Sequence, residues 1–230
     1  MNKNINLIFE DGNDMNVLYG TSVREVIKNI NDPSVIALRI NGSAVSPDYA
    51  IVEDSYINYI TVNDRPGSKI YFKGLEFVYI KAVKDVLGDK AVVGIKHSLD
   101  KGLYTEITSG KRIDVSDVEK IKRRMLEIIN SDMEFKTINV SREDAFEYVT
   151  NRGEEEKALN YTYMTNDSVT MYELGGEYNY FYYIMPPSTK ILKRFDLTYL
   201  APNGVLISYP INNVLPKYNP TPQVLNVFKA

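Results

Sequence analysis

The segment INLIFEDGNDMNVLYGTSVREVIKNI, residues 5–30, decides the fold of the first part of the chain. Its first half alternates apolar and polar residues around a turn at residues 11–13, a pattern that predicts a β-hairpin. Its second half places Ser22 and Glu25 at capping-box spacing ahead of apolar residues at helical intervals. We therefore expect a helix that begins after Ser22 and ends at Asp32-Pro33.

Two further strands are expected at residues 35–40 and 56–62, with a turn at Asn41-Gly42 after the first. Residues 1–63 would then contain two strands, a helix and two strands in that order. This order predicts a β-grasp, or ubiquitin-like, domain.

The rest of the chain predicts an α+β domain. Residues 63–67, Asn-Asp-Arg-Pro-Gly, are expected to form a linker, followed by a long amphipathic helix at 68–87. Two more helices are expected at 116–129 and 141–150. The expected strands lie at residues 91–95, 103–107, 135–140, 169–174, 178–185, 191–200 and 205–209. Residues 68–209 would form this domain, and the proline-containing residues 210–230 would form an exit linker.

Composition excludes several classes of site. The 230 residues include no cysteine and one histidine, so a disulfide framework, a thiol nucleophile and any site with two histidines are excluded. The formal net charge of −3 argues against general attraction to phosphates, and we expect no DNA partner. No apolar run long enough to cross a membrane and no signal peptide are apparent, so we expect a cytoplasmic protein without a membrane partner.

No catalytic motif is apparent in the sequence. A phosphate-cradling Gly-x-x-x-x-Gly-Lys-Ser/Thr loop and a dinucleotide-binding Gly-x-Gly-x-x-Gly string are both absent. We therefore expect no catalytic residue in this chain.

His97 is expected in a polar loop between two strands, close to Lys101 and Tyr104. Such a loop either contacts an anion or a carbonyl group of a ligand, or holds a histidine that hydrogen-bonds within its own turn. The charged runs at residues 120–124 and 154–157 are expected to be solvated helix faces.

Tyrosine is unusually frequent, with 18 in the chain. Alternation over residues 178–182 would place Tyr178, Tyr180 and Tyr182 on one face of a strand. Such a face either stacks nucleobases or packs half-buried against a sheet or another domain.

Specific strings resemble a known family. Residues 1–63 resemble a TGS domain, the β-grasp module at the start of threonyl-tRNA synthetases, and residues 68–209 are similar to the second additional, or editing, domain of those enzymes. The matching landmarks are residues 82–87, 101–104, 118–129, 141–145 and 151–154.

In that family the editing domain carries a His-x-x-x-His pair on the helix and a Cys-x-x-x-His pair at a strand end as zinc-type ligands. The corresponding positions here lie near Lys73 and Phe77 and within residues 181–186, and none of the four ligands is present. We therefore expect no metal in this chain.

A second family, the bacterial uridine kinase-like nucleoside kinases, is similar over residues 97–104, 185–189 and 195–197. Its members share the two-domain arrangement without the metal ligands and continue into a P-loop kinase domain. The resemblance implies a noncatalytic amino-terminal half of such a kinase. ATP and magnesium are then expected only in a kinase domain that would follow residue 230.

The main expectation is therefore a ligand-binding or regulatory region with a cleft between the helix at 68–87 and the sheet. This cleft would hold a small nucleotide-like ligand or an RNA end. Its expected lining residues are His97, Lys101, Tyr104, Lys73, Tyr180 and Tyr182. Two alternatives stay open: a free-standing synthetase-like module that binds or edits aminoacyl-tRNA without metal, and a docking or oligomerisation module with its tyrosine face between subunits.

Overall fold

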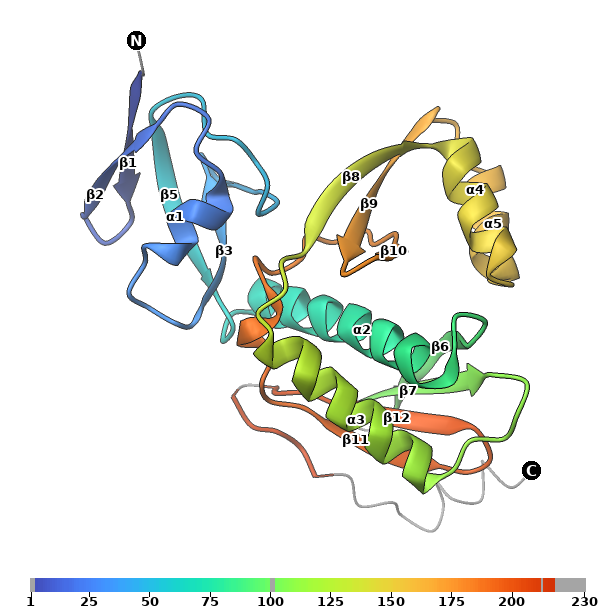
Figure 1. The fold of residues 1–230 in the computed structure, drawn as a ribbon. Coiled ribbons are helices and arrows are strands. Elements are labelled where there is room, and N and C mark those ends of the chain that lie inside the picture. The colour runs from blue at the N-terminus through green and yellow to red at the C-terminus, as the bar shows by residue number, and fades with distance from the viewer. Residues whose placement is uncertain (1–2, 100–101, 212, 218–230) are drawn as a thin grey trace. The chain divides into compact units, whose positions relative to one another are not determined.

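The computed structural model describes residues 3–99, 102–211 and 213–217, and shows an α+β fold (Figure 1). The chain divides into two compact units that do not follow chain order. The first comprises residues 1–78, 129–139 and 170–192, and the second comprises residues 79–128, 140–169 and 193–230. Within the described ranges, no helix has both the length and the apolar character that crossing a membrane demands.

The first unit begins with a five-stranded sheet in the order β2-β1-β5-β3-β4. Its elements are β1 (Asn4–Phe9), β2 (Asp14–Leu18), α1 (Val23–Lys28), β3 (Val35–Ile40), β4 (Ser43–Ala44) and β5 (Ser55–Thr61). The two parallel strands β1 and β5 lie at its centre, flanked by antiparallel neighbours, which confirms the β-grasp. The buried core is built from the inward residues of these elements, among them Ile5, Leu7, Val26, Leu38 and Ile57.

The capping box at the start of α1 is confirmed. The Ser22 amide donates to the Glu25 carboxylate at 2.9 Å, and the Glu25 amide donates to the Ser22 hydroxyl at 3.3 Å. The helix ends at Lys28, before the expected Asp32-Pro33 stop. The backbone N–H of Asn29 turns back to the carbonyls of Val26 and Ile27, which closes the last turn early.

Helix α2 spans Arg65–Leu87, so the prediction of a linker through Gly67 was wrong. The Asp64 carboxylate accepts the Thr61 amide at 2.7 Å, and the Asp64 carbonyl accepts the Ser68 amide at 2.8 Å, which starts the helix early. Pro66 is tolerated there because amides of the first turn have no partner within the helix. Gly67 is required, since a Cβ at this position would stand 1.8 Å from the Thr61 carbonyl oxygen.

A three-stranded sheet follows in the order β10-β9-β8, built from β8 (Lys136–Ser141), β9 (Ser168–Leu174) and β10 (Glu177–Asn179). The predicted strand over 178–185 was wrong beyond Asn179. The Asn179 side chain accepts the Tyr180 amide at 2.9 Å, which takes that donor from the strand ladder, and Pro186 and Pro187 have no amide to offer. The chain continues irregularly to the short 3₁₀ helix η1 (Thr189–Ile191).

The second unit contains a four-stranded antiparallel sheet in the order β11-β12-β7-β6. Its strands are β6 (Val92–Leu99), β7 (Gly102–Thr108), β11 (Asp196–Leu200) and β12 (Gly204–Ser208). In addition to the second half of α2, its helices are α3 (Val115–Asn130), α4 (Arg142–Asn151) and α5 (Glu155–Thr162). β6 runs to Leu99, so His97 lies on a strand and not in the predicted loop. The strand predicted over 191–200 begins only at Asp196.

Candidate functional site

A hollow of about 440 Å³ lies between the first half of α2 and the irregular segment after β10. We call it the aromatic hollow. Its lining residues are Lys69, Phe72, Lys73, Glu76, Tyr180, Phe181, Tyr182 and Tyr183. Three of the six predicted site residues, Lys73, Tyr180 and Tyr182, therefore lie together.

Helical periodicity places the α2 residues of this lining. Positions 72 and 73 follow position 69 by three and four residues, and position 76 follows them by four and three, so these side chains share one face of the helix. Gly74 lets the irregular segment approach this helix closely, since a Cβ there would stand 2.7 Å from Pro186 Cγ. A larger residue at 74 would push the two walls of the hollow apart.

The far end of the irregular segment is anchored by Arg24 of α1. This buried guanidinium donates to the carbonyl oxygens of Pro187 and Phe135 and to the Asp48 carboxylate. Burial raises the pKa of Asp48, but hydrogen bonds from Arg24 and Thr137 outweigh it and hold that pKa below its ordinary value. The segment that carries the tyrosines is thus fixed although it belongs to no sheet.

An aromatic cluster reaches the hollow through Phe181, one of its lining residues. The Phe77 ring lies 5.3 Å from the Phe181 ring and 6.0 Å from the Phe135 ring, measured between centroids. At the mouth, the Tyr180 and Tyr182 rings meet edge to face at 4.8 Å. Tyr182 is 86% exposed, so one aromatic face stands open to solvent beside a packed cluster.

The described lining of the aromatic hollow has more positive than negative side chains. Lys73 Nζ lies 2.7 Å from the carboxylate of Glu76, whose side chain is only 7% exposed. Lys69 Nζ lies 6.0 Å from the centre of the Tyr183 ring. The lining residues that the structure describes therefore include two ammonium groups and one carboxylate. Burial raises the pKa of Tyr180, so its hydroxyl is neutral at physiological pH.

The two helix residues that lie near the synthetase metal-ligand positions by resemblance do not fit a metal ion. Lys73 presents an ammonium group, which has no lone pair to donate, and Phe77 presents a hydrocarbon ring. Across the described part of the chain, no group of three or more His, Cys, Asp or Glu residues is placed to hold a metal. The described lining of the aromatic hollow offers ring faces for stacking and ammonium groups for cationic contacts.

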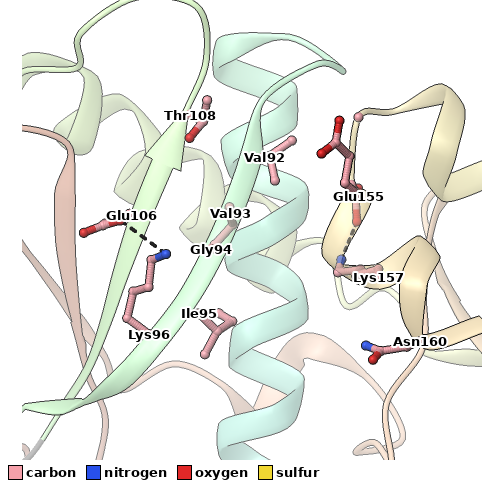
Figure 2. Close-up of a pocket in the computed structure, with 12 residues that line it drawn as sticks. Val92, Val93, Gly94, Ile95, Lys96, Glu106, Thr108, Glu155, Lys157 and Asn160 are labelled. Carbon is pink, nitrogen blue, oxygen red and sulfur yellow. Dashed lines mark ion pairs between the residues drawn. The ribbon is translucent and has the colours of Figure 1, made fainter.

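A second hollow, of about 420 Å³, lies in the other unit between strands β6 and β7 and helix α5 (Figure 2). We call it the charged hollow. Figure 2 marks the ion pair between Lys96 and Glu106 on the strands, 3.4 Å apart, and a second ion pair at Lys157 on α5. The partner of Lys157 is Glu154, 2.5 Å away.

Glu154 overturns the prediction that residues 154–157 form only a solvated helix face. It is 6% exposed and also lies 2.6 Å from Lys84 Nζ, whose side chain is 3% exposed. Burial raises the pKa of Glu154, but Lys157 and Lys84 outweigh it and the pKa is lowered overall. The sequence contains no signal for this pair, because its partners stand far apart along the chain.

The other predicted site residues also belong to the second unit. His97 is exposed on β6, and its ring lies 5.3 Å from that of Tyr104 on β7. Tyr104 is only 4% exposed and packs against Leu200 and Leu206, so it is a core residue of the sheet. Burial raises the pKa of Tyr104 to about 12. Lys101 lies outside the described residues, as do residues 218–230 of the predicted exit linker.

Sequence reasoning missed several lining residues of the aromatic hollow: Lys69, Phe72, Glu76, Phe181 and Tyr183. For two of the three helical residues the signal was available, since stepping four residues back or three residues forward from Lys73 reaches Lys69 and Glu76. The other two neighbour predicted tyrosines in sequence and were hidden by the incorrect strand assignment.

Comparison with known proteins finds relatives but no matching family model. The chain is 29% identical over 201 residues to the threonine–tRNA ligase of Desulforamulus reducens, covering 86% of this chain and 32% of that protein. It is 26% identical over 197 residues to the threonine–tRNA ligase of Oceanobacillus iheyensis, covering 84% and 30%. It is 26% identical over 202 residues to threonine–tRNA ligase 2 of Bacillus subtilis, covering 86% and 32%.

The chain therefore spans about a third of the length of the curated relatives it matches. The relatives fit the α+β fold with a β-grasp domain followed by an editing-like domain.

Proposed function

We propose that this chain is a synthetase-like module that binds the aminoacylated end of an RNA in the aromatic hollow without a metal. The observation that carries the proposal is the hollow itself. It lies where the resemblance places the editing centre, and in place of metal ligands it has an open ring, two lysines and one carboxylate.

The lining suits the end of a single strand. Aromatic rings bind unpaired bases of any sequence by stacking, and lysines beside them attract the backbone. Tyr182 provides the open ring, and the Lys73–Glu76 pair provides a donor and an acceptor for ribose hydroxyls or an aminoacyl group.

Binding is proposed rather than hydrolysis. Among the described lining residues there is no histidine, and the one carboxylate is ion-paired to Lys73, so these residues offer no free general base. The relatives are threonine–tRNA ligases, and their names support this synthetase alternative better than the amino-terminal half of a nucleoside kinase.

The test is the variant Tyr182→Ala with a nonhydrolysable 3′-aminoacylamino-adenosine and a short RNA ending in it as probes. Calorimetry should show binding to the natural chain and a weakening of about 10- to 100-fold in the variant, from the ~1–3 kcal/mol that stacking one base supplies. Unfolding by urea should be unchanged because the ring is 86% exposed.

Tyr163→Ala is the matched control, since Tyr163 is 76% exposed and lies outside the aromatic hollow. No binding by the natural chain, or equal binding by both variants, would contradict the proposal. Light scattering on the same samples tests the docking alternative: a self-association that Tyr182→Ala abolishes would assign the open ring to a subunit contact.

A further inference from the structure

We infer that Lys69 and Lys73 form a phosphate-binding pair, so that the aromatic hollow takes a 5′-phosphorylated nucleotide in preference to a bare nucleoside. The inference rests on the proposed function and names the chemical class of its ligand. A free nucleotide and the last phosphodiester of an RNA share this chemistry.

The first observation is geometric. Lys69 and Lys73 are four residues apart on α2, so their side chains project one above the other from the same helix face into the same hollow. Lys73 Nζ lies 5.4 Å from the Phe72 ring centre and 5.9 Å from the Phe181 ring centre. Lys69 Nζ lies against Tyr183 in the same way. Ring contacts thus hold both ammonium groups at the wall of the hollow.

The second observation is the charge balance. Glu76 is the only acidic residue among the described lining residues, and it pairs with Lys73. Within the described ranges, Lys69 has no carboxylate at ion-pair distance. A lysine ammonium has three donors, so Lys73 keeps donors for a ligand while Glu76 holds it in place. The described lining residues thus carry one positive charge in excess, beside aromatic rings.

A phosphorylated nucleotide complements this lining. A phosphate monoester carries about −1.5 to −2 charge at neutral pH, which complements the free charge of Lys69. Lysine binds phosphate as a point charge and needs no fixed approach angle. A ligand with a base on Tyr182 and a phosphate at Lys69 would use both the open ring and the unpaired charge, whereas a nucleoside would use only the ring.

The experiment compares AMP with adenosine by calorimetry on the full chain. We expect AMP to bind about tenfold more tightly than adenosine, the difference that one charge-assisted hydrogen bond supplies. Lys69→Met should abolish this preference, and Lys69→Arg should retain it. Folding should tolerate both, because Lys69 is exposed. Lys96→Met in the charged hollow is the matched control and should retain the preference.

The outcomes separate this inference from the proposed function. Equal affinity for AMP and adenosine, failure of both to bind, or a preference that survives Lys69→Met would each overturn the phosphate pair. The proposed function would still be judged by the aminoacyl-adenosine probe and Tyr182→Ala.

The RNA arm identifies the source of the phosphate. If Lys69→Met also weakens binding of the short RNA and lowers its salt dependence by about one phosphate contact, the pair serves an RNA end. If only AMP binding changes, the pair serves a free nucleotide. Both results support the phosphate pair.

Discussion

The two hollows have similar volumes, about 440 and 420 Å³, but their lysines differ in how they are paired. In the charged hollow, Lys96 pairs with Glu106 and Lys157 pairs with Glu154. In the aromatic hollow, Lys73 is paired and Lys69 lies against a ring.

From this difference we assign a structural role to the buried, paired charges at the charged hollow and a binding role to Lys69 in the aromatic hollow. A buried charge that loses its partner is strongly destabilising, so paired charges such as Lys84 and Glu154 mark a place where the fold depends on them. Lys69 has no carboxylate at ion-pair distance among the described residues, lies over the Tyr183 ring, and is available to a ligand. Substitution of the buried Glu154 in the charged hollow should therefore change stability, and substitution of the exposed Lys69 or Tyr182 in the aromatic hollow should change affinity.

The largest expected effect is that of Glu154→Gln. It removes the carboxylate that lies between Lys84 and Lys157, and the loss of a buried partner costs about 3–5 kcal/mol. Urea unfolding should show this loss. Glu155→Gln is the matched control, because Glu155 is exposed and such substitutions change stability by less than about 0.5 kcal/mol. Equal stability of the two variants would contradict the structural role of Glu154 in the charged hollow.

The contribution of Glu154 to the free energy of unfolding should depend on pH. The pKa of Glu154 is lowered in the folded state, so its contribution is fully present above the unfolded value, near 4.5. That contribution is lost as the pH falls through the lower folded pKa. The stability difference between the natural chain and Glu154→Gln should therefore be constant from pH 7 to about 5 and should narrow below about 4.5. Urea midpoints measured at several pH values would show this, and a gap independent of pH would contradict it.

Local signals explain which parts of the fold were predictable. Ser22 with Glu25, and Ser141 with Asp144, carry their capping information within four residues, and both caps are present. The alternation in residues 5–30 likewise specified the first hairpin and helix of the β-grasp. The parallel pairing of β1 with β5 followed from the order of these elements.

The errors have long-range or competing causes. Alternation predicted a strand through residue 185, but the Asn179 side chain and two prolines ended it. The burial of Glu154 depends on Lys84, which stands on another helix. Local and long-range causes also separate the predicted site residues. Lys73, Tyr180 and Tyr182 lie together as expected. The core packing of Tyr104 instead depends on Leu200 of β11 and Leu206 of β12, which are distant in sequence.

The smallest expected effect is that of the exposed Lys96–Glu106 ion pair. The Lys96–Glu106 pair lines the charged hollow, but its side chains are 41% and 47% exposed, so water screens their attraction. A double-mutant cycle with Lys96→Met and Glu106→Gln should give a coupling free energy of about 0.2–1 kcal/mol. We expect a value near the lower end of this range because 3.4 Å separates the Lys96 nitrogen from the Glu106 carboxylate oxygen. Neither variant should change the affinity for AMP. A coupling as large as the loss in Glu154→Gln would mean that pairing alone, and not burial, makes the charged hollow structural. A loss of AMP binding in Lys96→Met would mean that paired lysines also recruit ligand, and the distinction between the two hollows would fail.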